Sequence, residues 1–371
     1  MNPPDNQLQQ LHGNILTPQG WVFGAVQFDQ RIHSVVGNGI NPSQNTHNYI
    51  VPGFIDLHVH GAAGRDVMEA GTATEAIARL HARHGTTSLL ATTMTAPDQD
   101  LEIALSGISA AMQISGMARV LGVHLEGPFI NPSKLGAQPE YVQPASLDVV
   151  HRLNAIAPIR LITLAPEIEG NLALVKALTQ IGIKVQLGHT LGSYEEALAA
   201  LNEGASGFTH LFNAMSGLDH RAPGMVGAAL AHANHAEIIP DLLHVHPGAI
   251  RAALRSIPGL YCVTDSTAAT GMPDGEYMLG RQKVFKCMGG VRTADGTLAG
   301  STLTMDQALR NLVSLGLDLA EASQRVSAHA AQFLGLTDRG LVQPDCYADL
   351  VVLDRELNIV DVIAEGQKIR R

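Results

Sequence analysis

Between residue 51 and about residue 338, short apolar runs alternate with helix-like segments. Bounded apolar runs of this length are typical of buried strands. The predicted strands occupy residues 51–60, 86–92, 119–126, 160–165, 183–189, 206–211, 237–242 and 260–265. Helices are predicted between most of them, for example at residues 74–84, 145–157, 171–181 and 193–203. The pattern therefore predicts an α/β fold.

Eight strands with helical crossovers favour a parallel (β/α)8 barrel of the TIM type. A doubly wound open sheet is the competing architecture. That fold commonly carries a Gly-x-Gly-x-x-Gly motif after its first strand, and the motif is missing here.

The two ends of the chain have a different pattern. Short apolar runs separated by turn residues fill residues 8–50, and two similar runs return at 348–354 and 359–364. This pattern is typical of small antiparallel β structure. We expect both ends to form one small β-sandwich domain, from residues 1–50 and 339–371, with the barrel inserted between them at residues 51–338.

Composition narrows the class of protein without changing this picture. Hydrophobic residues make up 46% and charged residues 16% of the chain, which is typical of a globular protein. The formal net charge of −10 disfavours nucleic acid and anionic membranes as main partners. No apolar stretch is long enough to span a bilayer. Three cysteines without a C-x-x-C pair, and residues 1–7 without a secretory signal, predict a cytoplasmic protein.

The candidate chemistry begins at the end of the first predicted strand. His58 and His60 are separated by one residue, so both imidazoles lie on the same face of a strand. Such a pair is a natural half of a metal site. The chain has 17 histidines, so chance also explains one such pair, and the interpretation depends on ligands at the ends of later strands.

Polar side chains do stand at those later ends, which form the active face of a barrel. They are His124 and Glu126 on the third strand, His189 on the fifth, His210 on the sixth and Asp265 on the eighth. Each one alone is also explained as a hydrogen-bonded buried group or a helix cap. Their recurrence at strand ends favours one common site, with a ligand set suited to zinc, iron, manganese or cobalt.

These motifs resemble those of a known family. The run Pro52-Gly53-Phe54-Ile55-Asp56-Leu57-His58-Val59-His60-Gly61 is similar to the opening of the amidohydrolase superfamily. Within it, nearly the whole chain resembles the N-acetylglucosamine-6-phosphate deacetylase branch. The segments that carry this resemblance are His124-Leu125-Glu126-Gly127-Pro128-Phe129, Gly188-His189-Thr190, Thr209-His210-Leu211-Phe212-Asn213-Ala214-Met215, Val263-Thr264-Asp265 and Leu298-Ala299-Gly300-Ser301.

The resemblance implies metal-dependent hydrolysis of N-acetylglucosamine-6-phosphate to glucosamine-6-phosphate and acetate, in amino-sugar catabolism. It implies that Glu126, His189 and His210 bind the principal ion. It also implies that His58 and His60 bind a second ion, which Glu126 can bridge. Some family members lack this histidine pair and use one ion, whereas here the pair is intact. We expect one or two divalent ions per subunit, with zinc ahead of iron, manganese and cobalt.

The expected mechanism follows from general chemistry. A metal ion lowers the pKa of bound water toward neutrality and polarises the acetyl carbonyl. Amide hydrolysis further needs a base for the attacking water and an acid for the departing amine. Asp265 is the candidate for both roles in turn, because a carboxylate beside cations stays ionised and can accept the first proton.

The resemblance also implies contacts with the substrate. Asn213 and the backbone of Ala214 are expected near the sugar phosphate, and His244 matches a substrate-binding histidine. Arg221 is expected to pair with the phosphate, in some relatives from the neighbouring subunit, which predicts a homodimer. His246 has no such match and is expected to be structural or exposed.

The segment Gly136-Ala137-Gln138 departs from the family pattern, which commonly has a histidine at its third position that reaches the substrate. Glutamine can donate a hydrogen bond but cannot carry a proton charge. The epimer of the sugar is therefore open, and N-acetylgalactosamine-6-phosphate is the alternative substrate. Further on, Ser301 or Thr302 is expected to cap a late helix, and the neighbouring Leu303 is a candidate for a backbone contact with substrate.

Two other functions remain to be weighed. Amidohydrolases that act on cyclic amides commonly carry a carboxylated lysine at the end of the fourth strand, but residues 161–167 contain no lysine and Glu126 supplies a carboxylate instead. A catalytically inactive scaffold would need neither the metal ligands nor Asp265, and all of them are present. A metal analysis would separate these cases.

Overall fold

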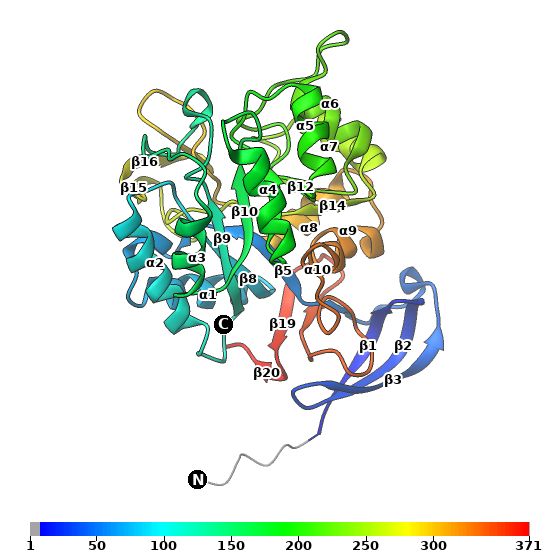
Figure 1. Ribbon diagram of the computed structural model, residues 1–371. Helices are drawn as coiled ribbons and strands as arrows, with labels where there is room; N and C mark the ends of the chain where they lie inside the picture. The colour runs from blue at the N-terminus through cyan, green and yellow to red at the C-terminus, as the bar shows by residue number, and fades with distance from the viewer. Residues whose placement is uncertain (1–7, 371) are drawn as a thin grey trace.

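The computed structural model describes residues 8–370 (Figure 1). Residues 1–7, in which no secretory signal was found, lie outside the described residues. Every predicted barrel strand is present. These strands are β5 (Phe54–Val59), β8 (Thr86–Thr93), β9 (Arg119–Glu126), β10 (Ile159–Leu164), β11 (Lys184–Leu187), β12 (Gly207–Phe208), β13 (His235–Ile238) and β14 (Gly259–Cys262).

These strands form two parallel arcs. One has six strands in the order β12-β11-β10-β9-β8-β5, and the other pairs β13 with β14. The arcs meet at both ends, because Leu211 N–H donates to Glu237 O at 2.9 Å and Asp265 N–H donates to His58 O at 2.9 Å. All eight residues of β8 are buried, as expected for a strand covered on both faces. The curled sheet fits a TIM-like barrel.

Helices surround the sheet (Figure 1). They are α1 (Ala73–Arg83), α2 (Asp98–Ala111), α3 (Leu147–Asn154), α4 (Asn171–Gln180), α5 (Tyr194–Asn202), α6 (Gly224–His232), α7 (Pro247–Ser256), α8 (Met305–Ser314), α9 (Leu319–Arg325) and α10 (Ala328–Leu334). In α1, Ile77, Ala78 and Ala82 lie on one face and are fully buried. No helix within residues 8–370 has the length and apolarity needed to cross a membrane.

The two chain ends pair with each other beside the barrel (Figure 1). They form a seven-stranded sheet in the order β20-β19-β18-β4-β1-β2-β3. Its strands are β1 (Gln9–Thr17), β2 (Gly20–Phe28), β3 (Ile32–Gly39), β4 (Tyr49–Pro52), β18 (Leu350–Leu353), β19 (Ile359–Ala364) and β20 (Gln367–Lys368). A second sheet that would complete a sandwich, and the division at residues 50 and 338, stay predictions.

Buried charges join this sheet to the barrel. Arg339 pairs with Asp349 at 2.5 Å and with Glu365, and Glu365 also pairs with Arg119 of β9. Arg339 donates as well to the hydroxyl of Ser88 in β8, at 3.4 Å. Because each charge has a partner, the desolvation cost of burying it is offset.

One part of the chain was not predicted and one prediction was wrong. The strands β15 (Gly275–Leu279), β16 (Gln282–Cys287) and β17 (Gly290–Arg292) form an antiparallel sheet between β14 and α8. The N-cap of α8 is Thr304, without a side-chain cap bond, and not Ser301 or Thr302. The Ser301 hydroxyl instead donates to Thr264 O at 2.5 Å, and residue 301 forms an isolated β-bridge with Ser266, the residue after Asp265.

The remaining elements are short. They are β6 (Gly61–Ala62), β7 (Arg65–Asp66) and the 3-10 helices η1 (Pro42–Gln44), η2 (Val67–Glu69) and η3 (Pro132–Lys134). η3 lies in the loop after β9, which also carries residues 136–138.

Candidate metal centre and pocket

The predicted ligands meet at the carboxyl ends of the barrel strands. Glu126 ends β9, and His189, His210 and Asp265 lie two or three residues after the ends of β11, β12 and β14. These last three residues have φ angles of 49°, 29° and 49°, in the left-handed region. A non-glycine residue held there costs about 1–3 kcal/mol. Such strain concentrates at functional sites because it aims a side chain at the turn from strand to loop.

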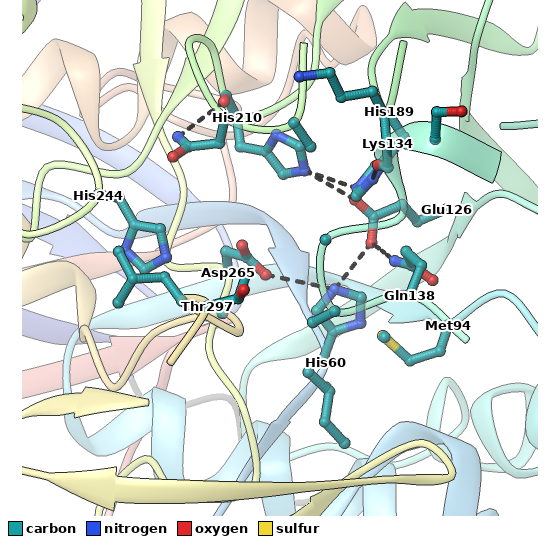
Figure 2. A pocket seen from close by; sticks show the side chains of 18 residues that line it. His60, Met94, Glu126, Lys134, Gln138, His189, His210, His244, Asp265 and Thr297 are labelled. Atoms are coloured by element: carbon teal, nitrogen blue, oxygen red, sulfur yellow. Dashed lines mark hydrogen bonds and ion pairs between the residues drawn. The ribbon is translucent and has the colours of Figure 1, made fainter. Parts of the chain in front are cut away.

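Glu126 divides the histidines into two groups. Its Oε1 lies 3.1 Å from His189 Nε2 and 3.2 Å from His210 Nε2. Its Oε2 lies 3.1 Å from His60 Nε2 and 3.5 Å from His58 Nε2. We call the Oε1 group the principal half-site and the Oε2 group the second half-site. Figure 2 shows Glu126 between His60 on one side and His210 on the other.

The opposite ring nitrogens indicate which atoms face the centre as acceptors. His60 Nδ1 lies 3.2 Å from Thr92 O, and His189 Nδ1 lies 2.8 Å from Lys134 O. A carbonyl only accepts, so each Nδ1 carries the hydrogen. In a neutral ring, Nε2 then presents a lone pair to the half-site.

The resulting geometry fits a bound cation. His58 Nε2 and His60 Nε2 are 3.1 Å apart, and so are His189 Nε2 and His210 Nε2. Two facing lone pairs at this distance repel unless a positive charge lies between them. Ligands that bind zinc at about 2.0–2.2 Å lie roughly 3–3.5 Å from each other. The donor set of each half-site therefore fits a divalent ion, and Glu126 could contribute one oxygen to each.

The electrostatics favour positive charge at the same place. Burial lowers the pKa of His58, but Glu126, Asp265 and Glu237 raise it, and the result lies well above the ordinary value. Burial raises the pKa of Glu126, whereas His58, His189 and His210 lower it to well below its ordinary value. A carboxylate-rich, buried cluster of imidazoles therefore binds cations readily, whether protons or metal ions.

Asp265 faces the second half-site. Its Oδ1 lies 3.4 Å from His60 Nε2 and 3.6 Å from His58 Nε2. The side chain is 11% exposed, through a cavity of about 350 Å³ that it helps to line. Asp265 can therefore meet both the cluster and a molecule in the cavity (Figure 2).

The structure brings most of the expected substrate residues to this cavity but not all. Its lining includes Ala137, Gln138, Asn213, Ala214 and His244. Two others do not line it. Arg221 lies in an exposed loop, and the Leu303 N–H donates to the Ser301 hydroxyl at 2.9 Å.

Gln138 contacts the cluster itself. Its amide nitrogen donates to Glu126 Oε2 at 2.5 Å, and its oxygen accepts from Thr95 N–H at 2.7 Å. The backbone donor of Thr95 fixes which end of the amide faces Glu126. Gln138 therefore supports the carboxylate that joins the two half-sites.

Three residues at the site were missed by the sequence analysis. The first is Asp241, whose Oδ2 lies 2.7 Å from His244 Nδ1. Burial lowers the pKa of His244, but the contact with Asp241 raises this pKa above its ordinary value. Lys134 is the one lysine or arginine in the described cavity lining. Glu237, which contacts His58, could have been suspected as the one carboxylate in the short buried strand β13.

Two other singled-out histidines lie outside the cluster. His124 turns into the barrel below it, where Nδ1 meets Leu57 O at 3.0 Å and Nε2 meets Thr163 Oγ1 at 2.7 Å. Burial and the neighbouring His58 hold its pKa well below the ordinary value. His246 is exposed and caps α7 by accepting from Gly248 N–H, which confirms its expected structural place.

Fold and cluster together define a barrel protein with a candidate divalent-metal centre built from histidines and a shared carboxylate. The chain belongs to the amidohydrolase family, whose model matches residues 49–369. It is 38% identical to an N-acetylglucosamine-6-phosphate deacetylase of Lysinibacillus sphaericus, over 92% of this chain and 90% of that one. It is also 38% identical to an N-acetylgalactosamine-6-phosphate deacetylase of Escherichia coli O157:H7, over 95% and 97%.

Solved structures agree with this assignment. An N-acetyl-D-glucosamine-6-phosphate deacetylase variant from Mycobacterium smegmatis, in complex with N-acetyl-D-glucosamine-6-phosphate, matches with a TM-score of 0.90. It is 32% identical, and the match covers 98% of this chain and 100% of that one. The resemblance to the deacetylase branch predicted from the sequence motifs is therefore confirmed.

Proposed function

We propose that this protein hydrolyses the acetamide of N-acetylglucosamine-6-phosphate to glucosamine-6-phosphate and acetate, in amino-sugar catabolism. A water oxygen bonds to the acetyl carbon, the carbon–nitrogen bond breaks, and a proton goes to the departing amine. The observation that carries the proposal is the carboxylate Asp265, which faces a histidine half-site and a cavity at once. The named relatives supply the choice of substrate.

In this mechanism, bound divalent ions supply the acidity that makes water nucleophilic and polarises the acetamide carbonyl. His189, His210 and Glu126 Oε1 would hold one ion, and His58, His60 and Glu126 Oε2 a second. Asp265 accepts the proton of the water and then delivers it to the sugar nitrogen. Zinc is our first choice of metal, with iron, manganese and cobalt as alternatives.

The cavity offers partners for a phosphorylated sugar. Lys134 supplies an ammonium group, and the Asp241 carboxylate favours the protonated form of His244. Figure 2 shows Lys134 at the end of the pocket where His189 and His210 lie, and Asn213 and Ala214 line the same cavity. Three free cysteines and a phosphorylated substrate fit a reducing, cytoplasmic compartment.

N-Acetylgalactosamine-6-phosphate is the second candidate substrate. It is supported by the E. coli relative, which matches over nearly the full length of both chains. Gln138 is engaged with Glu126 and Thr95, so it is not free to contact the sugar unless it leaves them.

The first test is acetate release from both phosphorylated sugars and from unphosphorylated N-acetylglucosamine, with and without a chelator. We expect release from a phosphorylated sugar that the chelator abolishes and added metal restores. The ratio between the two phosphorylated sugars decides the epimer.

Failure would be informative. No release from any of the three sugars by the metal-loaded protein would point to a cyclic-amide hydrolase. No release together with no bound metal would point to the inactive scaffold.

We further propose that the protein is a homodimer and that Arg221 of the second subunit completes the binding site for the substrate phosphate. Arg221 lies outside its own cavity, in a loop where residues 218–222 are all exposed. We expect Arg221→Met to raise the KM for the phosphorylated sugar, because a charge-assisted contact is lost. The KM for the unphosphorylated sugar should not change.

Mixing subunits tests whether Arg221 acts across the interface. Refolded mixtures of Arg221→Met chains with Asp265→Asn chains should regain activity, since the second kind donates an intact arginine to the first. A purely monomeric mass by light scattering, or mixtures no better than their parts, would contradict this arrangement.

A further inference from the structure

Glu237 of β13 is a carboxylate that the proposed chemistry does not use. Its side chain is completely buried. His58 Nδ1 lies 3.0 Å from its Oε2, and the backbone N–H of His210 donates to the same oxygen at 3.2 Å. A single carboxylate oxygen therefore contacts one histidine of each half-site.

The charge of Glu237 has no conventional counter-ion. Among residues 8–370, the structure shows an ion pair of Glu237 with His58 but with no lysine or arginine. Its other oxygen receives the hydroxyl of Tyr261 at 3.4 Å, and Gln186 donates to that hydroxyl at 2.6 Å. Burying a carboxylate this completely is costly unless positive charge lies nearby. That charge is available only through His58 and whatever cation its far nitrogen binds.

The contact also determines how His58 meets the second half-site. A carboxylate accepts, so His58 Nδ1 carries the hydrogen. In the neutral ring, which is the form that binds a metal ion, Nε2 then presents its lone pair toward His60 and Glu126. His60 and His189 are held in the same way, but by the carbonyls of Thr92 and Lys134. His58 is therefore the histidine whose support carries a full negative charge, which makes its Nε2 the more basic ligand atom.

We propose that Glu237 is a positioning residue that orients His58, raises its basicity and thereby sets the metal affinity of the second half-site. This inference rests on the proposed two-ion site and deepens it. It makes the two half-sites unequal. Glu237 contacts the imidazole of His58 in the second half-site, but in the principal half-site it contacts only the backbone N–H of His210.

The test is a titration of metal-free protein with Co²⁺ alone, followed by visible absorption and by competition with a chelator. Two ions should bind in two phases of the titration, and the phase that is lost in His60→Asn belongs to the second half-site. In Glu237→Gln, which keeps the shape but removes the charge, we expect that phase to weaken about 10–100-fold, the range for loss of such a supporting partner. The phase of the principal half-site should stay close to wild type.

Tyr261→Phe is the matched control. It disturbs the same buried network, at the other oxygen of Glu237, without touching His58. A merely structural role would make both variants lose Co²⁺ affinity alike, whereas the proposal expects the loss in Glu237→Gln alone. Equal losses, or unchanged second-phase affinity in Glu237→Gln, would overturn it.

A measurement on the wild-type protein covers the case in which Glu237→Gln does not fold. A buried imidazole N–H donating to a carboxylate should give a downfield, exchange-protected proton resonance that disappears in His58→Asn. Its absence would overturn the proposal. Wild-type protein that binds only one Co²⁺ would overturn both this inference and the two-ion site. Two bound ions with the expected asymmetry, but no acetate release, would support the inference and refute the proposed substrate.

Discussion

Asp265→Asn should lower kcat for the phosphorylated sugar by about 10²–10⁴-fold, the usual contribution of a general acid–base group. Asparagine has nearly the same shape but can neither take a proton from water nor return one to the amine. Because the principal half-site consists of Glu126, His189 and His210, its ion should remain bound. The measurement is steady-state kinetics together with metal analysis of the same preparation.

A neighbouring carboxylate provides the control. Asp56 of β5 is fully buried and accepts from the Thr264 hydroxyl at 2.6 Å, but it is not in the cavity lining. Asp56→Asn is expected to reduce stability more than turnover. If Asp265→Asn kept turnover comparable to wild type, the assignment of the base would be wrong.

Glu126→Gln should remove both ions and, with them, the activity. The two oxygens of Glu126 serve different half-sites, at 3.1 Å from His189 Nε2 and 3.1 Å from His60 Nε2. Glutamine offers one oxygen and one amide nitrogen, whose hydrogens repel a cation, and it removes a negative charge from among four imidazoles. We expect both affinities to fall by more than about 100-fold, the upper range for losing an indirect partner. Elemental analysis after dialysis would measure this.

Glu167→Gln is the comparison for this variant. Glu167 follows β10 and accepts from the Thr190 hydroxyl at 2.5 Å and from the Leu191 N–H at 2.7 Å, close to the site but outside its cavity lining. The Glu167→Gln variant should keep both ions. Glu126→Gln that still purified with two ions would show that Glu126 is not shared between them.

The barrel was readable from the sequence because its strands are buried on both faces and stand out as separate apolar runs. Strands predicted at 86–92 and 119–126 are observed at Thr86–Thr93 and Arg119–Glu126. The antiparallel sheet of β15–β17 was missed, because half of its residues are exposed and the buried ones are too scattered to give an apolar run.

The sequence by itself determined which chemistry gathers at the carboxyl ends of the strands, since strand ends follow from the apolar pattern and parallel strands bring their ends together. Only the tertiary structure decided which of these side chains face the two half-sites and which bond elsewhere. His124 and Glu126 lie on one face of β9, yet His124 bonds to Leu57 and Thr163 below the cluster while Glu126 faces two half-sites.

The same holds for the contacts of Gln138 and Glu237 and for the place of Arg221. Each depends on depth in the barrel, rotamer and the partner brought by another strand or loop. These are long-range relations, and a linear pattern of polar and apolar positions does not contain them.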